Sequence, residues 1–166
     1  MNRRKLLLID TGPLRELITF RAVFNLGFER LRKDLLFVSD VLSYETFGQY
    51  IGSFQTKSTT ASVIVELDRW IRKTHSAGRE QIWSLIYDEF RGMRMEEQIV
   101  KLLDMPMELV TRCGPTDVSL LTLALQQFDS EPVVLTIDRE LVSECSNARI
   151  HTIQIQEIIG RPDVTK

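Results

Sequence analysis

Two strongly apolar runs, each followed by an aspartate, restrict the fold of this chain more than any other feature. Residues 6–9 read Leu-Leu-Leu-Ile and lead into Asp10, and residues 133–137 read Val-Val-Leu-Thr-Ile and lead into Asp138. Apolar runs of this length, without polar alternation, are typical of strands buried on both faces, as in parallel sheets. The sequence therefore predicts an α/β protein with two central strands.

Helical spacing between these runs supports the same class. We expect helices over residues 13–23, 61–71, 82–90, 118–125 and 139–145, where apolar side chains recur three and four positions apart. Residues 35–38 and 150–155 read as further strands, and the hydroxyl-rich stretch 46–60 reads as a loop or short helices, with residues 58–60 capping the next helix. Strands that alternate with helices predict an α/β sandwich with a mostly parallel sheet.

The chain reads as one domain. Its 166 residues carry no repeat, low-complexity tract or Pro/Gly-rich linker, so we assign residues 1–160 to a single domain and residues 161–166 to a short tail. The apolar stretch after the basic start ends at Asp10, which is too short for a signal peptide or a membrane span. We therefore expect a cytoplasmic protein with free thiols and no membrane partner.

Composition excludes several functional classes. Twenty-one Lys and Arg residues against 23 Asp and Glu give a formal charge of −2, so bulk positive charge cannot hold nucleic acid, although a local basic patch can. Two cysteines and two histidines are too few for a disulfide scaffold, a four-ligand zinc site or a histidine-rich metal site. A metal here would have to be a hard cation bound by carboxylates.

Four acidic residues stand where an acid is not expected: Asp10, Glu66, Asp117 and Asp138. A buried carboxylate is unfavourable unless it is paired or binds a cation. Each acid also has a structural explanation, because an aspartate can occupy a turn, cap a helix or complement the helix dipole, and a glutamate can face solvent. Their joint placement is what favours a Mg²⁺ or Mn²⁺ site.

The ordered set of motifs resembles the PIN-domain family. The motifs are Leu-Leu-Ile-Asp-Thr-Gly at residues 7–12, Val-Ile-Val-Glu-Leu at 63–67, Gly-Pro-Thr-Asp at 114–117 and Thr-Ile-Asp at 136–138, and they span nearly the whole chain. The resemblance implies a three-layer α/β/α fold and a Mg²⁺- or Mn²⁺-dependent ribonuclease. It also implies an RNA substrate, and for a VapC-like toxin an antitoxin protein or a homodimer as partner.

The resemblance carries the four acids over as the catalytic and metal-binding residues. Asp10 and Asp117 would bind the ion directly, and Glu66 and Asp138 would bind through water or orient the nucleophile. Thr11 and Thr136 would hydrogen-bond a carboxylate or a phosphate oxygen, or satisfy local backbone groups. A divalent ion at such a site makes water more acidic and stabilises charge on the scissile phosphate.

A basic run after Glu66 is the candidate substrate-binding surface. Arg69, Arg72 and Lys73 follow that acid within seven residues, although such a run is also typical of a solvated helix face. Apolar residues between Ile82 and Met107 predict self-association or a small protein partner, unless they belong to the core. The long gap between Asp10 and Glu66 predicts extra structure over residues 32–60.

Other functions are less compatible with the motifs. A haloacid-dehalogenase phosphatase would carry a second aspartate where Gly12 stands, a response-regulator receiver would carry an acidic pair at the first strand, and a P-loop enzyme would carry a Gly-Lys-Ser/Thr motif. The alternative of a different class is a PIN-like module that binds RNA or a protein without catalysis.

Overall fold

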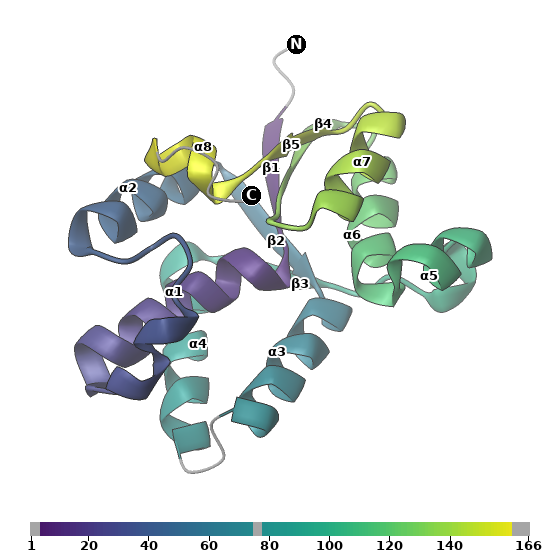
Figure 1. Ribbon diagram of the computed structural model, residues 1–166. Coiled ribbons are helices and arrows are strands. Elements are labelled where there is room, and N and C mark those ends of the chain that lie inside the picture. The colour runs from purple at the N-terminus through teal and green to yellow at the C-terminus, as the bar shows by residue number, and fades with distance from the viewer. Residues whose placement is uncertain (1–3, 75–77, 161–166) are drawn as a thin grey trace.

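A five-stranded, fully parallel sheet forms the middle layer of the computed structural model, which describes residues 4–74 and 78–160 (Figure 1). The strands run in the order β3-β2-β1-β4-β5. Their bounds are β1 Arg4–Ile9, β2 Thr56–Thr60, β3 Met95–Gln98, β4 Ser130–Leu135 and β5 His151–Ile153. The central pair is β1 and β4, in register from Arg4 beside Ser130 to Ile9 beside Leu135.

Helices cover both faces of this sheet and complete a three-layer α/β/α sandwich, as the sequence predicted. Figure 1 shows α1, α2 and α8 on one side of the sheet and α6 and α7 on the other. The helices are α1 Thr11–Leu26, α2 Val41–Gly52, α3 Ala61–Thr74, α4 Arg79–Met93, α5 Met107–Cys113, α6 Pro115–Leu125, α7 Arg139–Asn147 and α8 Ile155–Ile159. Within the described residues, two 3₁₀ segments lie between these elements: η1 Glu29–Asp34 between α1 and α2, and η3 Leu102–Asp104 between β3 and α5.

The central strands are buried because helices cover both of their faces. Leu7, Leu8 and Ile9 in β1 have no exposed surface, and Val134 and Leu135 in β4 have none either.

Local sequence fixes where two helices begin. Strand β1 and helix α1 meet at Asp10, whose carboxylate caps α1. Pro115 opens α6 at a position where its missing N–H is not needed. Local chemistry thus places both helix starts beside the sheet.

The second strand lies at β2, so the prediction of a strand over residues 35–38 is wrong. The backbone N–H groups of Leu36, Phe37 and Val38 donate to the Glu16 carboxylate at 2.9–3.1 Å, which holds this segment in an irregular conformation. Phe37 and Val38 still reach the core from there. An apolar run alone does not distinguish this arrangement from a strand.

The hydroxyl-rich stretch contains that strand instead of a loop. Residues 46–52 belong to α2 and residues 56–60 form β2, so residues 58–60 end a strand and do not form a cap. Thr59 Oγ1 donates to the Ile9 carbonyl at 2.7 Å, and Thr60 Oγ1 lies 2.7 Å from Ser119 Oγ. These contacts satisfy the hydroxyl groups in the core.

Several further predictions need only small corrections. The sequence did not predict β3, and residues 150–155 divide into β5 and the start of α8. The predicted extra structure over residues 32–60 consists of the end of η1, then α2 and β2. The tail assigned to residues 161–166 lies outside the described residues. Among the residues described, no helix has both the length and the apolar character needed to cross a membrane.

Candidate functional site

The carboxyl ends of the parallel strands share one edge of the sheet, and this edge gathers the predicted acids. Asp10 follows β1, and Asp138 follows β4 by three residues. Glu66 lies on α3, which begins directly after β2, and Asp117 lies in the first turn of α6. Ligands of open parallel sheets bind at this edge, so the topology favours a site here.

Asp10 is the most buried of the four acids, with 5% of its surface exposed. Its Oδ1 accepts a hydrogen bond from the Thr11 N–H at 2.6 Å, and its Oδ2 accepts one from Thr136 Oγ1 at 2.7 Å. Thr136 is fully buried, and its Oγ1 also accepts from the Asp138 N–H at 2.9 Å. One threonine therefore connects the ends of the two central strands.

Thr11 connects the same place to α3. Its Oγ1 donates to Glu66 Oε2 at 2.8 Å, although Glu66 as a whole residue is exposed. Both predicted threonines thus contact predicted acids. The polar network runs from Glu66 through Thr11 and Asp10 to Thr136 and the backbone of Asp138.

Asp138 caps a helix, as one reading of the sequence expected. Its Oδ1 accepts from the N–H groups of Glu140 and Leu141 at 2.7 and 3.1 Å. This cap does not exclude a second role, because the other carboxylate oxygen has no contact described for it. The carboxylate lies at the edge where the four acids gather.

Asp117 differs from the other three acids because its half-buried carboxylate has no hydrogen-bond partner among the described residues. Its pKa is raised from 3.8 to about 7, chiefly by burial and then by the charges of Asp10, Asp138, Glu66 and Glu140. A carboxylate in this position is destabilised by its acidic neighbours and would be stabilised by a cation.

Asp10 has a raised pKa for related reasons. Its pKa is about 6: burial raises the pKa most, the hydrogen bonds from Thr136 and Thr11 lower it, and the charges of Glu66 and Asp138 raise it. The mutual effects of the four acids indicate that their charges lie within electrostatic range of one another. Such coupled, raised pKa values are typical of functional sites.

One observation favours binding of a divalent metal ion by the four acids, and another opposes it. All four candidate ligands offer hard oxygen donors, and the free Asp117 carboxylate among acidic neighbours suits Mg²⁺ or Mn²⁺. However, no three Asp, Glu, His or Cys side chains within residues 4–74 and 78–160 stand in an arrangement that could hold an ion. The hydrogen bonds of Asp10, Glu66 and Asp138 direct those carboxylates to protein donors.

The predicted basic residues differ in whether they form ion pairs. Arg72 pairs with Asp68 on its own helix, and Arg79 pairs with the same aspartate at 3.0 Å. Arg69 and Lys73 are exposed and have no ion-pair partner in the described part of the chain. They follow Glu66 by three and seven positions, so they share its helix face.

Sequence reasoning missed three neighbours of the site. Arg15 lies one helical turn after Thr11, and its guanidinium sits 5.2 Å from the centre of the Trp70 ring. Glu140 contributes to the raised pKa of Asp117. Ser119 contacts Thr60 across the sheet edge. The spacing of Arg15 from Thr11 was the one available signal, because the other two contacts need the tertiary fold.

Comparison with known proteins adds no assignment: no protein-family model matches the chain, and no curated protein matches it significantly. The fold and the acids at its carboxyl edge are therefore the features from which a function can be inferred.

Proposed function

We propose that this protein is a PIN-like, metal-dependent endoribonuclease that hydrolyses RNA phosphodiester bonds. The observation that carries the proposal is the coupling of Asp10, Glu66, Asp117 and Asp138 at the carboxyl edge of the sheet. Burial, together with repulsion among these acids, raises the pKa of both Asp10 and Asp117, which is expected where a cation normally balances the charge.

Asp10 and Asp117 would hold the divalent ion directly, and Glu66 and Asp138 would contribute through water or orient the attacking water. When bound, Mg²⁺ or Mn²⁺ makes water more acidic and stabilises negative charge on the phosphate. Thr136 and Thr11 position this set, because their hydroxyl groups hold Asp10 and Glu66 by hydrogen bonds of 2.7 and 2.8 Å. Binding would require the carboxylates to turn toward one another from these partners.

Arg69 and Lys73 are the proposed phosphate-binding residues. Both are exposed on the helix face that carries Glu66, whereas the ion pair with Asp68 makes Arg72 the weaker candidate. Contacts between cations and phosphates release counterions, so RNA binding through these residues should weaken as the salt concentration rises. We further propose action in the cytoplasm, with an antitoxin protein as partner if the nuclease is a toxin.

The alternative function is a PIN-like module that binds RNA or a protein without cleaving it. The observation that favours it is the absence, in the described ranges, of three acidic side chains arranged around one point. The two functions make opposite predictions for metal-dependent cleavage.

A cleavage assay separates them. Purified protein should cut single-stranded RNA with Mg²⁺ or Mn²⁺ and stop when a chelator is added. Asp10→Asn and Asp117→Asn should each lower the rate at least a hundredfold, since each removes a charge from the metal site. Asp129→Asn is the matched control, because Asp129 is exposed and precedes β4 at the opposite edge. RNA binding without cleavage would support the inactive module, and full activity of both site variants would refute the nuclease assignment.

A further inference from the structure

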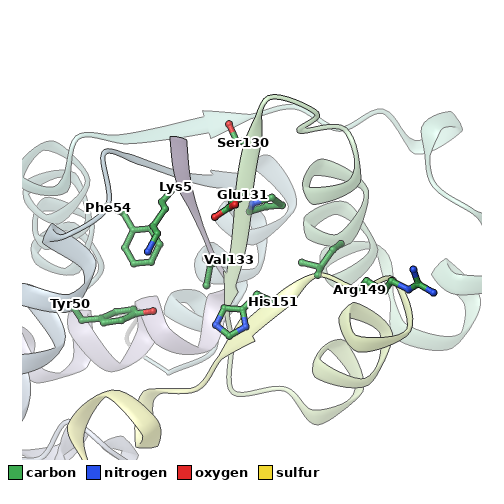
Figure 2. Close-up of a pocket in the computed structure, with 10 residues that line it drawn as sticks. Lys5, Tyr50, Phe54, Ser130, Glu131, Val133, Arg149 and His151 are labelled. Carbon is green, nitrogen blue, oxygen red and sulfur yellow. The ribbon is translucent and has the colours of Figure 1, made fainter. Parts of the chain in front are cut away.

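A hollow lies at the opposite edge of the sheet from the acids. It has a volume of about 420 Å³ and is formed by the start of β1, β4 and β5 and by the end of α2 (Figure 2). The side chains that matter for its chemistry are those of Lys5, Tyr50, Phe54, Glu131 and His151. Its volume is within the range of small-molecule sites, about 300–1,000 Å³.

Strand register explains why these side chains face one space. Lys5 pairs with Glu131 across β1 and β4, and Val133 pairs with His151 across β4 and β5. Registered partners point to the same face of a sheet, and residues two apart on a strand share that face. Lys5, Glu131, Val133 and His151 therefore form one floor.

The aromatic wall comes from α2 and the residues after it. The Tyr50 and Phe54 rings meet edge to face, with their centres 5.4 Å apart and their planes at 64°. Phe54 is nearly buried, whereas Tyr50 is partly exposed. Figure 2 shows Lys5 beside Phe54, and the Tyr50 hydroxyl directed toward His151. A planar group can lie against the Tyr50 ring and still meet polar atoms.

The charged groups of the hollow are not paired with each other. Neither Lys5 nor Glu131 has an ion-pair or hydrogen-bond partner for its side chain within residues 4–74 and 78–160. Lys57, with 9% of its surface exposed, does not line the hollow, because its Nζ donates to the Phe54 carbonyl at 2.8 Å. The residues that line the hollow include two cations, Lys5 and Arg149, and one acid, Glu131, so the hollow favours an anion.

We propose that this hollow binds a nucleoside monophosphate. The phosphate would lie at the Lys5 ammonium and the His151 ring nitrogen, and the base would lie against the Tyr50 ring. Glu131 can accept hydrogen bonds from ribose hydroxyls or an exocyclic amine. The site stands apart from the carboxylates, and the inference does not depend on the proposed nuclease activity.

The test uses adenosine 5′-monophosphate as the probe, titrated into the full chain by calorimetry in the presence of a chelator. Inorganic phosphate and adenosine, titrated separately, report the phosphate and base contributions. We expect the monophosphate to bind more tightly than either part. Lys5→Gln and His151→Gln should each weaken binding on the order of tenfold, equivalent to about 1.4 kcal/mol.

Two control variants locate the site. Lys101→Gln removes an exposed cation elsewhere and should leave binding unchanged. Asp10→Asn changes the carboxylate site and should also leave binding unchanged, so failure of the nuclease assignment would not affect this result. When adenosine 5′-monophosphate is added to the unaltered protein, the NMR signals of Lys5, Tyr50 and His151 should shift. This readout does not depend on the folding of any variant. No binding at millimolar probe, or shifts confined to the acidic edge, would overturn the proposal.

Discussion

At the scale of single residues, Asp10 and Asp117 are the least favourable ionised groups described in the site. Asp10 has two hydrogen-bond donors that partly offset its burial, whereas Asp117 has none among the described residues. Both carboxylates keep protons at a pH where a free aspartate has lost them. The folded protein therefore stores unfavourable electrostatic energy at this edge, as many functional sites do.

This gives a pH dependence with a definite sign. In chelator, the unfolded chain releases the Asp117 proton near pH 3.8 and the folded protein holds it until about pH 7. The free energy of unfolding should therefore fall as the pH rises across that window, because the folded state binds more protons. The shift of Asp10 to about 6 acts in the same direction.

Urea unfolding at a series of pH values measures this decline. Asp117→Asn should remove the share of this decline that the Asp117 proton causes. Asp129→Asn should leave the dependence of the free energy of unfolding on pH unchanged. Added Mg²⁺ should restore stability near neutral pH if it binds the folded protein alone. A free energy of unfolding that rises between pH 4 and 7 in chelator would contradict the assignment of raised pKa values.

At the scale of elements, the helices of the site were the most predictable part. Pro115 and the apolar spacing after it indicate α6, and Asp138 caps α7 as the sequence suggested. The second strand was not predictable, because β2 reads Thr-Lys-Ser-Thr-Thr and is buried only through the partners its hydroxyl groups find in the fold.

The candidate site, too, could be predicted only in part from the sequence. Sequence order indicated which acids could share an edge, since carboxyl ends of parallel strands meet there. It could not indicate that Asp68 would engage both Arg72 and Arg79, because the choice of ion-pair partner depends on how α3 and α4 pack. It also could not indicate that Thr136 would join Asp10 to the Asp138 backbone.

Glu16 gives the element-scale prediction. Its buried carboxylate accepts three backbone N–H groups from residues 36–38 and replaces the strand partners that this segment lacks. Glu16→Ala should lower the free energy of unfolding by about 3 kcal/mol, because buried donors lose a charged acceptor.

The matched control is Glu45→Ala, an exposed position on α2, where a change within about 0.5 kcal/mol is expected. Chemical denaturation measures both values. Equal effects of the two substitutions would show that the Glu16 contacts do not hold the segment.

At the scale of the whole molecule, exposed apolar side chains gather over the connection from β3 to α5. The exposed residues are Ile99, Leu102, Leu103 and Met107, and Leu103 has 95% of its surface exposed. Ile82 and Ile86, which lie in the same predicted region, belong to the core. Self-association therefore stays a prediction, and the expected interface is now restricted to the connection from β3 to α5. Exposed apolar groups that lie together are typical of interaction surfaces.

Light scattering tests it. The protein should show a mass above that of one chain, and Leu103→Glu should reduce it. Leu42→Glu, at another exposed position on α2, should leave the mass unchanged. A monodisperse monomer at micromolar concentration would contradict self-association, and co-purification of a small partner would then be the next measurement.

The pairing of β1 with β4 has a consequence for synthesis on the ribosome. The first strand of the sheet finds its neighbour on one side only after residues 130–135 have been made, and Asp10 meets Thr136 across 126 positions. Contacts this distant in sequence form late and slowly. A growing chain would thus stay without an assembled carboxylate cluster until most of it has left the exit tunnel. Under the proposed nuclease function, this order of assembly would delay cleavage of the RNA around the chain.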